Sequence, residues 1–277
     1  VSTDDELNVI LNMEYPKEIG WASENYDYLN DNNAMSVFSD QNYSLIETNS
    51  MMRWKNFSDV DTKLCYDTTF INSEFLDQVL RKSIIKHFLE KHQENTRRDV
   101  IRCTFHELSE IAAQTSGPKY VFSHIYVPHP PFIFGPNGEN VTPDHREISG
   151  LQSWENPQGY INQLIYATNE VSTVIKNIIK NDPDAIIIVQ GDTGTATMFP
   201  STPTEFKDVY QIHSILYAIR IPDVANSDTM IPVNTYRIIF NNYFDMDYEY
   251  LEQHSYMLDQ NNVWIDITEK LREYRYD

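Results

Sequence analysis

The hydrophobic positions of the chain fall into runs with helical spacing and runs with extended spacing. Apolar residues recur about every three to four positions over 75–89, which predicts a helix. The basic pair Arg97-Arg98 is expected to end this helical stretch. A second helix is expected from about Asp99 to Gln114, because Gly117-Pro118 follows it. The apolar stripe after Asn156-Pro157 predicts another helix, since Asn is a good N-cap and Pro fits the first turn.

Continuous apolar runs predict strands between these helices. Tyr120 to Val127 is rich in β-branched and aromatic residues, and prolines follow it. Ala185 to Val189 is apolar throughout, which is typical of a strand buried on both faces of a parallel sheet. Ile212 to Ile221 is a further strand candidate, Val233 to Phe244 is expected to be a helix, and a polar helix is expected near Ile267 to Tyr274.

The order of these elements predicts an α/β fold with a mostly parallel sheet sandwiched by helices. We expect a single domain over residues 1–277. Residues 1–72 are expected to be an irregular part of loops and short helices, residues 73–256 the core, and residues 257–277 a C-terminal helix and tail. Phe132 to Glu155 is expected to be a long polar loop.

The charge balance narrows the class of partner. The chain has 41 Asp and Glu against 21 Lys and Arg, a net charge of −20. Such a surface repels the nucleic-acid backbone and anionic lipid, so neither is expected as a partner. The sequence has no apolar window long enough to span a membrane. Because the chain begins with Val1, we expect any signal or membrane anchor to lie outside it.

Cysteines and sequons favour an exterior compartment. Cys65 and Cys103 are an even pair, and the disulfide between them is expected if the compartment is oxidising. The alternative is two buried thiols together with unused sequons. Three Asn-x-Ser/Thr sequons are glycosylation candidates: Asn42, Asn56 and Asn140.

The sharpest chemical signal is AIIIVQGDTG at residues 185–194. Ligands of open α/β sheets bind beyond the carboxyl ends of strands, and Asp192 stands directly after this one. A carboxylate there is a good ligand for a hard metal ion. The alternative is that Asp-Thr-Gly simply makes a turn.

A second signal is HIYVPHPPF at residues 124–132. His124 is expected inside the strand and His129 just beyond it, on opposite faces, so they are not expected to share an ion. For His124 we favour a satisfied core histidine. His129, between prolines, is a candidate to hydrogen-bond a substrate oxyanion.

Three segments together resemble a known family. PKYVFSHIYVPHPPFIFGPNGE, YINQLIYATNEVSTVIKNIIKNDPDAIIIVQGD and IPVNTYRIIFNNYF resemble the alkaline-phosphatase/sulfatase superfamily, in particular sulfatase-like extracytoplasmic domains of the lipoteichoic-acid-synthase type. The resemblance runs from about residue 2 to 256. It implies a divalent manganese or zinc ion that activates a Thr or Ser nucleophile, which attacks phosphorus or sulfur to form a covalent intermediate.

The resemblance assigns roles to individual residues. LNMEY at residues 11–15 matches the segment after the family's nucleophile, which places Thr3 at the nucleophile position. Asp192 matches the Asp of the family's Asp-His-Gly, and His129 matches a substrate-binding histidine. Thr193 stands where the family has the histidine ligand, and a neutral hydroxyl is a poor replacement for imidazole.

These departures leave hypotheses of different classes. The family's first metal-binding acid lies on a strand upstream of the nucleophile, and here it is expected to be outside the chain or lost. The first hypothesis is a pseudoenzyme at the cell surface that contacts envelope glycans, lipid head groups or other surface-protein subunits and has no cofactor. The second is a metal-dependent phospho- or sulfo-ester hydrolase or transferase that uses Thr3 and one Mn or Zn ion. A weaker third is a carbohydrate-binding module, for which the 18 tyrosines would provide platforms.

Overall fold

The computed structural model divides the chain into two units. Unit 1 comprises Val1–Asn42 and Asp184–Asp277, and unit 2 comprises Tyr43–Pro183. Each unit contains helices and strands, which confirms the α/β class. The expectation of a single domain over the whole chain stays a prediction. The structure describes residues 3–16, 27–51, 57–66, 86–143, 154–195, 206–259, 261 and 263–276.

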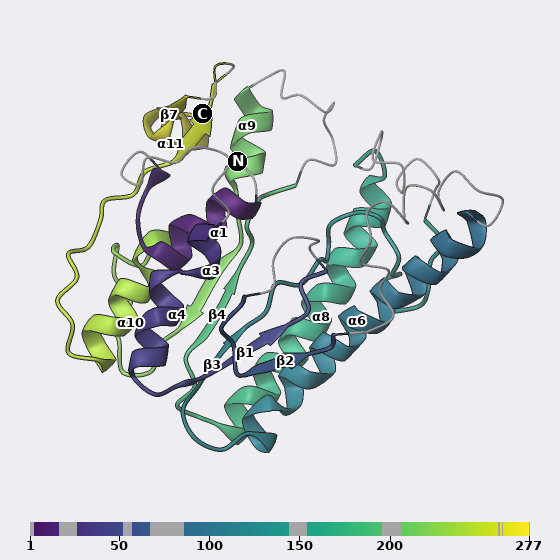
Figure 1. Ribbon diagram of the computed structural model, residues 1–277. Coiled ribbons are helices and arrows are strands. Elements are labelled where there is room, and N and C mark those ends of the chain that lie inside the picture. Colours follow the sequence, from purple (N-terminus) through teal and green to yellow (C-terminus); the bar gives the residue numbers. More distant parts are fainter. Residues whose placement is uncertain are drawn as a thin grey trace. The chain divides into compact units, whose positions relative to one another are not determined.

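Unit 2 is built from a three-stranded parallel sheet and two long helices. β1 (Ser44–Thr48) is the central strand and pairs in parallel with β2 (Thr62–Leu64) on one side and β3 (Lys119–Phe122) on the other. α6 (Lys86–Gln114) and α8 (Pro157–Asn181) lie side by side next to this sheet (Figure 1). Parallel strands need crossover connections, and α6 lies in the connection from β2 to β3.

The bounds of α8 follow from local sequence. The side chain of Asn156 accepts a hydrogen bond from the backbone N–H of Gly159 at 2.8 Å, and Pro157 occupies the first turn. At the other end the N–H of Asp182 bonds to the carbonyl of Ile178 at 2.8 Å. The predicted start of this helix is confirmed.

An aromatic cluster joins α6, α8 and the segment after β3. The ring of Tyr166 on α8 lies 4.4 Å from that of Phe134 and 6.0 Å from that of Phe105 on α6, measured between centroids. Aromatic pairs at such distances add to the free energy of burying their surface. The cluster as a whole consists of Ile101, Phe105, Ile133, Phe134, Tyr166 and Val174.

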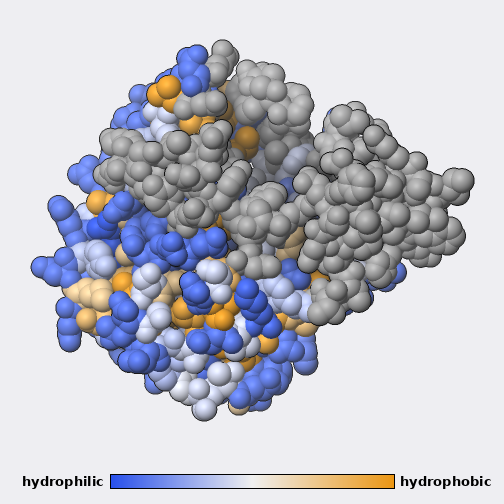
Figure 2. Space-filling model, viewed as in Figure 1, coloured by the Kyte–Doolittle hydropathy of each residue, from blue (hydrophilic) through white to orange (hydrophobic). Residues whose placement is uncertain are grey.

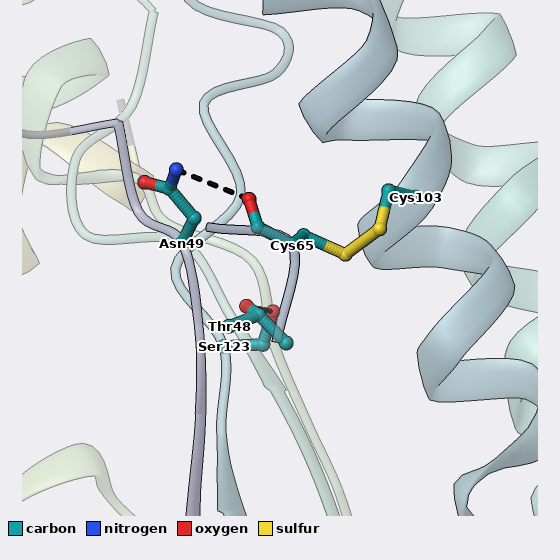
Figure 3. Close-up of a disulfide and its surroundings, with 5 residues drawn as sticks. All are labelled: Thr48, Asn49, Cys65, Cys103 and Ser123. Carbon is teal, nitrogen blue, oxygen red and sulfur yellow. Dashed lines mark hydrogen bonds between the residues drawn. A yellow bond between two sulfur atoms is a disulfide. The ribbon is translucent and has the colours of Figure 1, made fainter. Parts of the chain in front are cut away.

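A disulfide ties the sheet of unit 2 to α6, as the sequence predicted. Cys65, just after β2, is bonded to Cys103 on α6, with a Cα–Cα distance of 5.8 Å (Figure 3). The side-chain amide of Asn49 donates to the carbonyl of Cys65 at 3.2 Å. Beside it, the hydroxyls of Thr48 and Ser123 hydrogen-bond at 2.6 Å across the ends of β1 and β3.

Unit 1 combines helices with two antiparallel strand pairs. β4 (Ile187–Gln190) pairs antiparallel with β5 (Tyr217–Arg220), and β6 (Tyr256–Leu258) pairs antiparallel with β7 (Trp264–Asp266). The helices are α1 (Thr3–Asn12), α3 (Asp27–Asn30), α4 (Asn33–Asp40), α9 (Phe206–His213), the 3-10 helix η1 (Pro232–Asn234), α10 (Thr235–Tyr243) and α11 (Thr268–Tyr276).

The N-terminal and C-terminal segments of unit 1 share one core. Val9 and Tyr15 pack with Val233 and Tyr256. The guanidinium of Arg237 on α10 donates to the carbonyl of Met13 at 3.0 Å from Nε and 2.6 Å from Nη2. This long-range packing fixes α1, whose first residue is the candidate nucleophile.

Several predicted element boundaries in unit 2 are wrong. α6 continues through Arg97-Arg98, where a break was predicted, because the buried Arg98 Nε donates to the carbonyl of Ile133 at 3.2 Å. β3 ends at Phe122, so His124 lies beyond the strand and not inside it. The segment Phe132–Phe134, predicted to begin a polar loop, is almost completely buried.

The predicted sheet also differs from the observed one. In the described residues, β4 pairs antiparallel with β5 and is half-buried, so the expected strand of a parallel sheet is wrong. The strand predicted over 212–221 is shorter in the structure, where β5 covers only Tyr217–Arg220. The start of the predicted range belongs to α9, which ends at His213. Within residues 1–72 the described parts contain the strands β1 and β2, which were not predicted, together with the expected short helices. Of the helix predicted over 75–89, all but the last turn lies outside the described residues.

The predicted helices near the C-terminus are confirmed. η1 and α10 cover the predicted span, and α11 covers the polar C-terminal helix. Among the described residues, no helix is long and apolar enough to cross a membrane. The face in Figure 2 is mostly hydrophilic where it is coloured, with smaller hydrophobic patches.

Candidate functional site

Two predicted site residues meet in unit 1. Thr3 is the first residue of α1, and Asp192 lies two residues after the end of β4. The Thr3 hydroxyl donates a short hydrogen bond to the carboxylate of Asp192, although 189 positions separate them in sequence. The fold thus brings Thr3 into contact with Asp192. The resemblance assigned the first to the nucleophile position and the second to a metal-ligand position.

Backbone contacts hold the turn that carries Asp192. The N–H of Gly191 bonds to the carbonyl of Leu216 at 2.9 Å, and the N–H of Gly194 to that of Ile212 at 2.7 Å. A side chain at 194 would lie only 1.9 Å from the carbonyl oxygen of Gln211, so this position requires glycine. The second oxygen of Asp192 accepts the N–H of Thr193 at 2.8 Å. Both carboxylate oxygens therefore have partners within the chain.

A second acid, Glu6, belongs to the same cluster. It lies one helical turn after Thr3, on the same face of α1, and is half-buried. Burial, followed by the charges of Asp192 and Asp5, raises the pKa of Glu6 to about 7. The spacing of three positions between Thr3 and Glu6 is a signal in the sequence that predicts their proximity within a helix.

The electrostatics of this cluster disfavour an anion. A helix N-terminus attracts negative charge, but the first turn of α1 already carries Asp4, Asp5 and Glu6. Together with Asp192 these side chains would repel a phosphate or sulfate group. The cluster is better suited to a proton or a cation.

The donor set fits a zinc or manganese site poorly. Asp192 and Thr3 supply two oxygens, while Thr193 stands where the resemblance noted in the sequence would place an imidazole ligand. Within the described parts of the chain, no group of three or more His, Cys, Asp or Glu side chains is placed to hold a metal ion. These residues therefore do not form a complete coordination sphere.

His129 belongs to unit 2 and sits among aromatic rings. Its ring lies 4.4 Å from that of Tyr126 and 5.1 Å from that of Trp154. Nδ1 lies 2.6 Å from the carbonyl oxygen of Pro130, which can only accept, so Nδ1 carries the proton. The peptide bonds before Pro128 and Pro131 are cis. The substrate-binding role of His129 stays a prediction.

A buried glutamine that sequence reasoning missed positions the His129 segment. Gln163 of α8 is fully buried, and its Nε2 donates to the carbonyl of His129 at 2.9 Å. Its Oε1 accepts the N–H groups of Ile133 at 2.9 Å and of Phe134 at 3.2 Å. One side chain thus satisfies three backbone groups, of which the N–H groups of Ile133 and Phe134 are buried.

Replacing Gln163 by leucine is expected to lower the free energy of unfolding of unit 2 by about 3 kcal/mol, because two buried backbone N–H groups and one part-buried carbonyl lose their partner. Urea denaturation followed by circular dichroism measures this change. The exposed Gln158→Leu on the same helix is the control and is expected to stay within about 0.5 kcal/mol of the wild type. Equal effects of the two substitutions would contradict the role of Gln163.

The sequons are exposed where the structure describes them. Asn42 lies in a turn after α4 with a φ of 59°. Asn140 is also exposed, and Asn56 lies outside the described residues. Their occupancy by glycans stays a prediction.

Comparison with protein-family models, with curated proteins and with solved structures finds no match to this chain.

Proposed function

We propose that this chain is an extracytoplasmic, sulfatase/phosphatase-like domain with a degenerate metal site, and that it serves as a non-catalytic component of a cell-envelope or surface assembly. On this proposal the fold is a member of the alkaline-phosphatase/sulfatase superfamily. The partners are envelope glycans, lipid head groups or other surface-protein subunits.

The observation that carries the proposal is the hydrogen bonding of Asp192. Its two carboxylate oxygens accept from the Thr3 hydroxyl and the Thr193 amide. In this arrangement Asp192 joins the start of α1 to the end of β4. The neighbouring Thr193 is a weak ligand, and the acids of the first turn of α1 would oppose an anionic ester.

The proposed location rests on the disulfide and the sequons. A disulfide between Cys65 and Cys103 is compatible with an oxidising compartment outside the cytoplasm. Exposed sequons at Asn42 and Asn140 support the same location.

An activity assay tests the proposal. The chain, saturated with Mn²⁺ or Zn²⁺, is expected to hydrolyse 4-nitrophenyl phosphate and 4-nitrophenyl sulfate no faster than the metal ion alone. Thr3→Ala is expected to give the same result. Turnover that is lost in Thr3→Ala and kept in Thr3→Ser would overturn the proposal.

Thr193→His is the matched gain-of-ligand variant. It places an imidazole beside Asp192, and isothermal titration is expected to show Zn²⁺ binding at least about tenfold tighter than in the wild type. Thr195→His, two residues further along, is the control for an added histidine that is not adjacent to Asp192. Wild-type affinity equal to that of Thr193→His would argue against a degenerate site.

The second candidate is a metal-dependent phospho- or sulfo-ester hydrolase or transferase in which Thr3 is the nucleophile. The contact between Thr3 and Asp192 favours it, because a nucleophilic hydroxyl needs a proton acceptor within hydrogen-bond distance. Attack by Thr3 would form a threonine ester and release the alcohol. A phosphorylated or sulfated Thr3 peptide, detected by mass spectrometry after rapid quenching, would identify this enzyme.

A further inference from the structure

A polar groove lies between α6 and α8 on the surface of unit 2. Its lining includes side chains from both helices: Arg102, His106 and Glu110 from α6 and Tyr166, Glu170 and Asn177 from α8. Asn137 and Gly138 complete one end. The groove belongs to unit 2, whereas the cluster around Asp192 belongs to unit 1. The proposed function does not use the groove.

The sequon at Asn140 is fixed at the end of this groove. Residues 134–140 form a tight hairpin, in which Phe134 and Asn140 form a β-bridge and the N–H of Gly135 bonds to the carbonyl of Glu139 at 2.9 Å. From the groove wall, Nη2 of Arg102 donates to the carbonyl of Gly138 at 2.9 Å and to Oδ1 of Asn140 at 2.7 Å. A residue of the groove therefore orients the amide that a glycan would occupy.

The amide nitrogen of Asn140 remains available. Asn140 is exposed, and its Nδ2 makes no hydrogen bond to the residues that the structure describes. The bond from Arg102 goes to Oδ1, so it does not compete with a bond formed at Nδ2. Val141 and Thr142, the rest of the sequon, are exposed as well.

The chemistry of the groove suits a neutral polyhydroxylated ligand. Glu110 and Glu170, in a chain of net charge −20, oppose an anion, while Arg102 opposes a metal cation. Carboxylates accept hydrogen bonds and the guanidinium donates them, as a sugar with many hydroxyls requires. The Tyr166 hydroxyl is protonated at neutral pH, as an ordinary tyrosine hydroxyl is, and can also donate; burial and Glu170 raise its pKa further, to about 12.

We propose that the α6–α8 groove is a carbohydrate site whose ligand is the glycan attached at Asn140. In the attachment, Nδ2 of Asn140 loses a proton and bonds to the anomeric carbon of an activated, lipid-linked sugar donor, from which the lipid phosphate leaves. A host oligosaccharyltransferase catalyses this step outside the cytoplasm, so the inference depends on the proposed location. The attached sugars then lie along Arg102 and Glu170.

Hydrogen exchange on the secreted chain tests this inference. The full chain is secreted from a glycosylating host, and peptide mass spectrometry is expected to find a glycan on Asn140. Thr142→Ala removes the sequon but keeps the contact between Asn140 and Arg102. In this variant the backbone amides of α6 and α8 that flank the groove are expected to exchange about fivefold faster. This factor corresponds to the loss of the net stabilisation of about one hydrogen bond.

Asn42→Gln is the matched control, because it removes an exposed sequon whose asparagine belongs to unit 1 and does not line the groove. It is expected to leave exchange in α6 and α8 unchanged. Glu170→Ala is expected to keep the glycan mass but to lose part of the protection. An unglycosylated Asn140, or a glycan whose removal leaves exchange at the groove unchanged, overturns the inference.

A free-sugar arm separates the two sources of carbohydrate. The Thr142→Ala chain is titrated with a neutral N-acetylated disaccharide, which is expected to bind the vacated groove and restore part of the protection. If the disaccharide binds while Asn140 of the wild type carries no glycan, the groove binds sugars from solution. That result would overturn the proposal that its ligand is the glycan attached at Asn140.

Discussion

Removing the disulfide is expected to lower the free energy of unfolding of unit 2 by about 4 kcal/mol. The bridge joins residues 38 positions apart, and closing a loop of that length removes about 13 cal/mol/K of entropy from the unfolded chain. At room temperature this corresponds to about 4 kcal/mol. The bridge also fixes the end of β2 against α6, so its loss is expected to loosen the contact between sheet and helix.

The measurement is urea denaturation of the oxidised and reduced protein. The double variant Cys65→Ala, Cys103→Ala is the matched comparison, because it removes the bridge without leaving a thiol. Its midpoint is expected to match that of the reduced wild type and to be insensitive to dithiothreitol. A loss below about 1 kcal/mol on reduction would show that the unfolded chain is already restricted in this region.

Raising the pH from 4.5 to 8 is expected to destabilise unit 1 by about 3 kcal/mol through Glu6. Burial and the nearby charges of Asp192 and Asp5 raise the pKa of Glu6 from 4.5 to about 7. A raised pKa in the folded state means that folding favours the protonated form. The resulting stability is present in full below pH 4.5 and is lost as the pH rises through 7.

Glu6→Gln is the variant that isolates this effect. The amide mimics the protonated carboxyl, so the variant is expected to be more stable than the wild type at pH 8 by about 3 kcal/mol and equal to it near pH 4. Glu269→Gln, on α11, removes the same charge from the surface and is expected to leave the Glu6 titration in place. Identical pH dependence in the wild type and in Glu6→Gln would contradict the prediction.

The same titration bears on the two candidate functions. A divalent cation at Asp192 would favour the ionised form of Glu6 and lower its pKa. If millimolar Mn²⁺ abolishes the pH-dependent loss of stability, the cluster binds a cation and the enzyme candidate gains support. If Mn²⁺ has no effect, the non-catalytic proposal is favoured.

Elements with strong local signals could be predicted from the sequence. α8 begins where Asn156 and Pro157 predicted, because a cap and its first turn involve only residues a few positions apart. The span of η1 and α10 was also predicted. The pairing of Cys65 with Cys103 needed only the assumption of an oxidising compartment, since there are two cysteines.

Elements stabilised by distant partners were missed. β1 contains Glu47, a charged residue that is 1% exposed in the central strand and accepts a hydrogen bond from the N–H of Phe57. Burial raises the pKa of Glu47, and no local pattern indicates such an environment. Arg98 was predicted to end a helix, yet it is buried against the carbonyl of Ile133. In each case a partner outside the local segment decided the outcome.

The candidate site divides in the same way. The sequence by itself determined which residues are chemically competent: a carboxylate after a strand at Asp192, and a hydroxyl at Thr3 through the family resemblance. It also determined the α/β class, because alternating apolar periods depend on local geometry alone.

Only the tertiary structure decided which of these residues meet. Thr3 and Asp192 are brought into hydrogen-bond contact because α1 packs on η1 and α10, which follow Asp192 in the chain. The pKa of Glu6 likewise depends on burial and on charges that folding brings close. Contacts between distant residues are set by the packing of whole elements, and the spacing of residues along the chain carries no record of them.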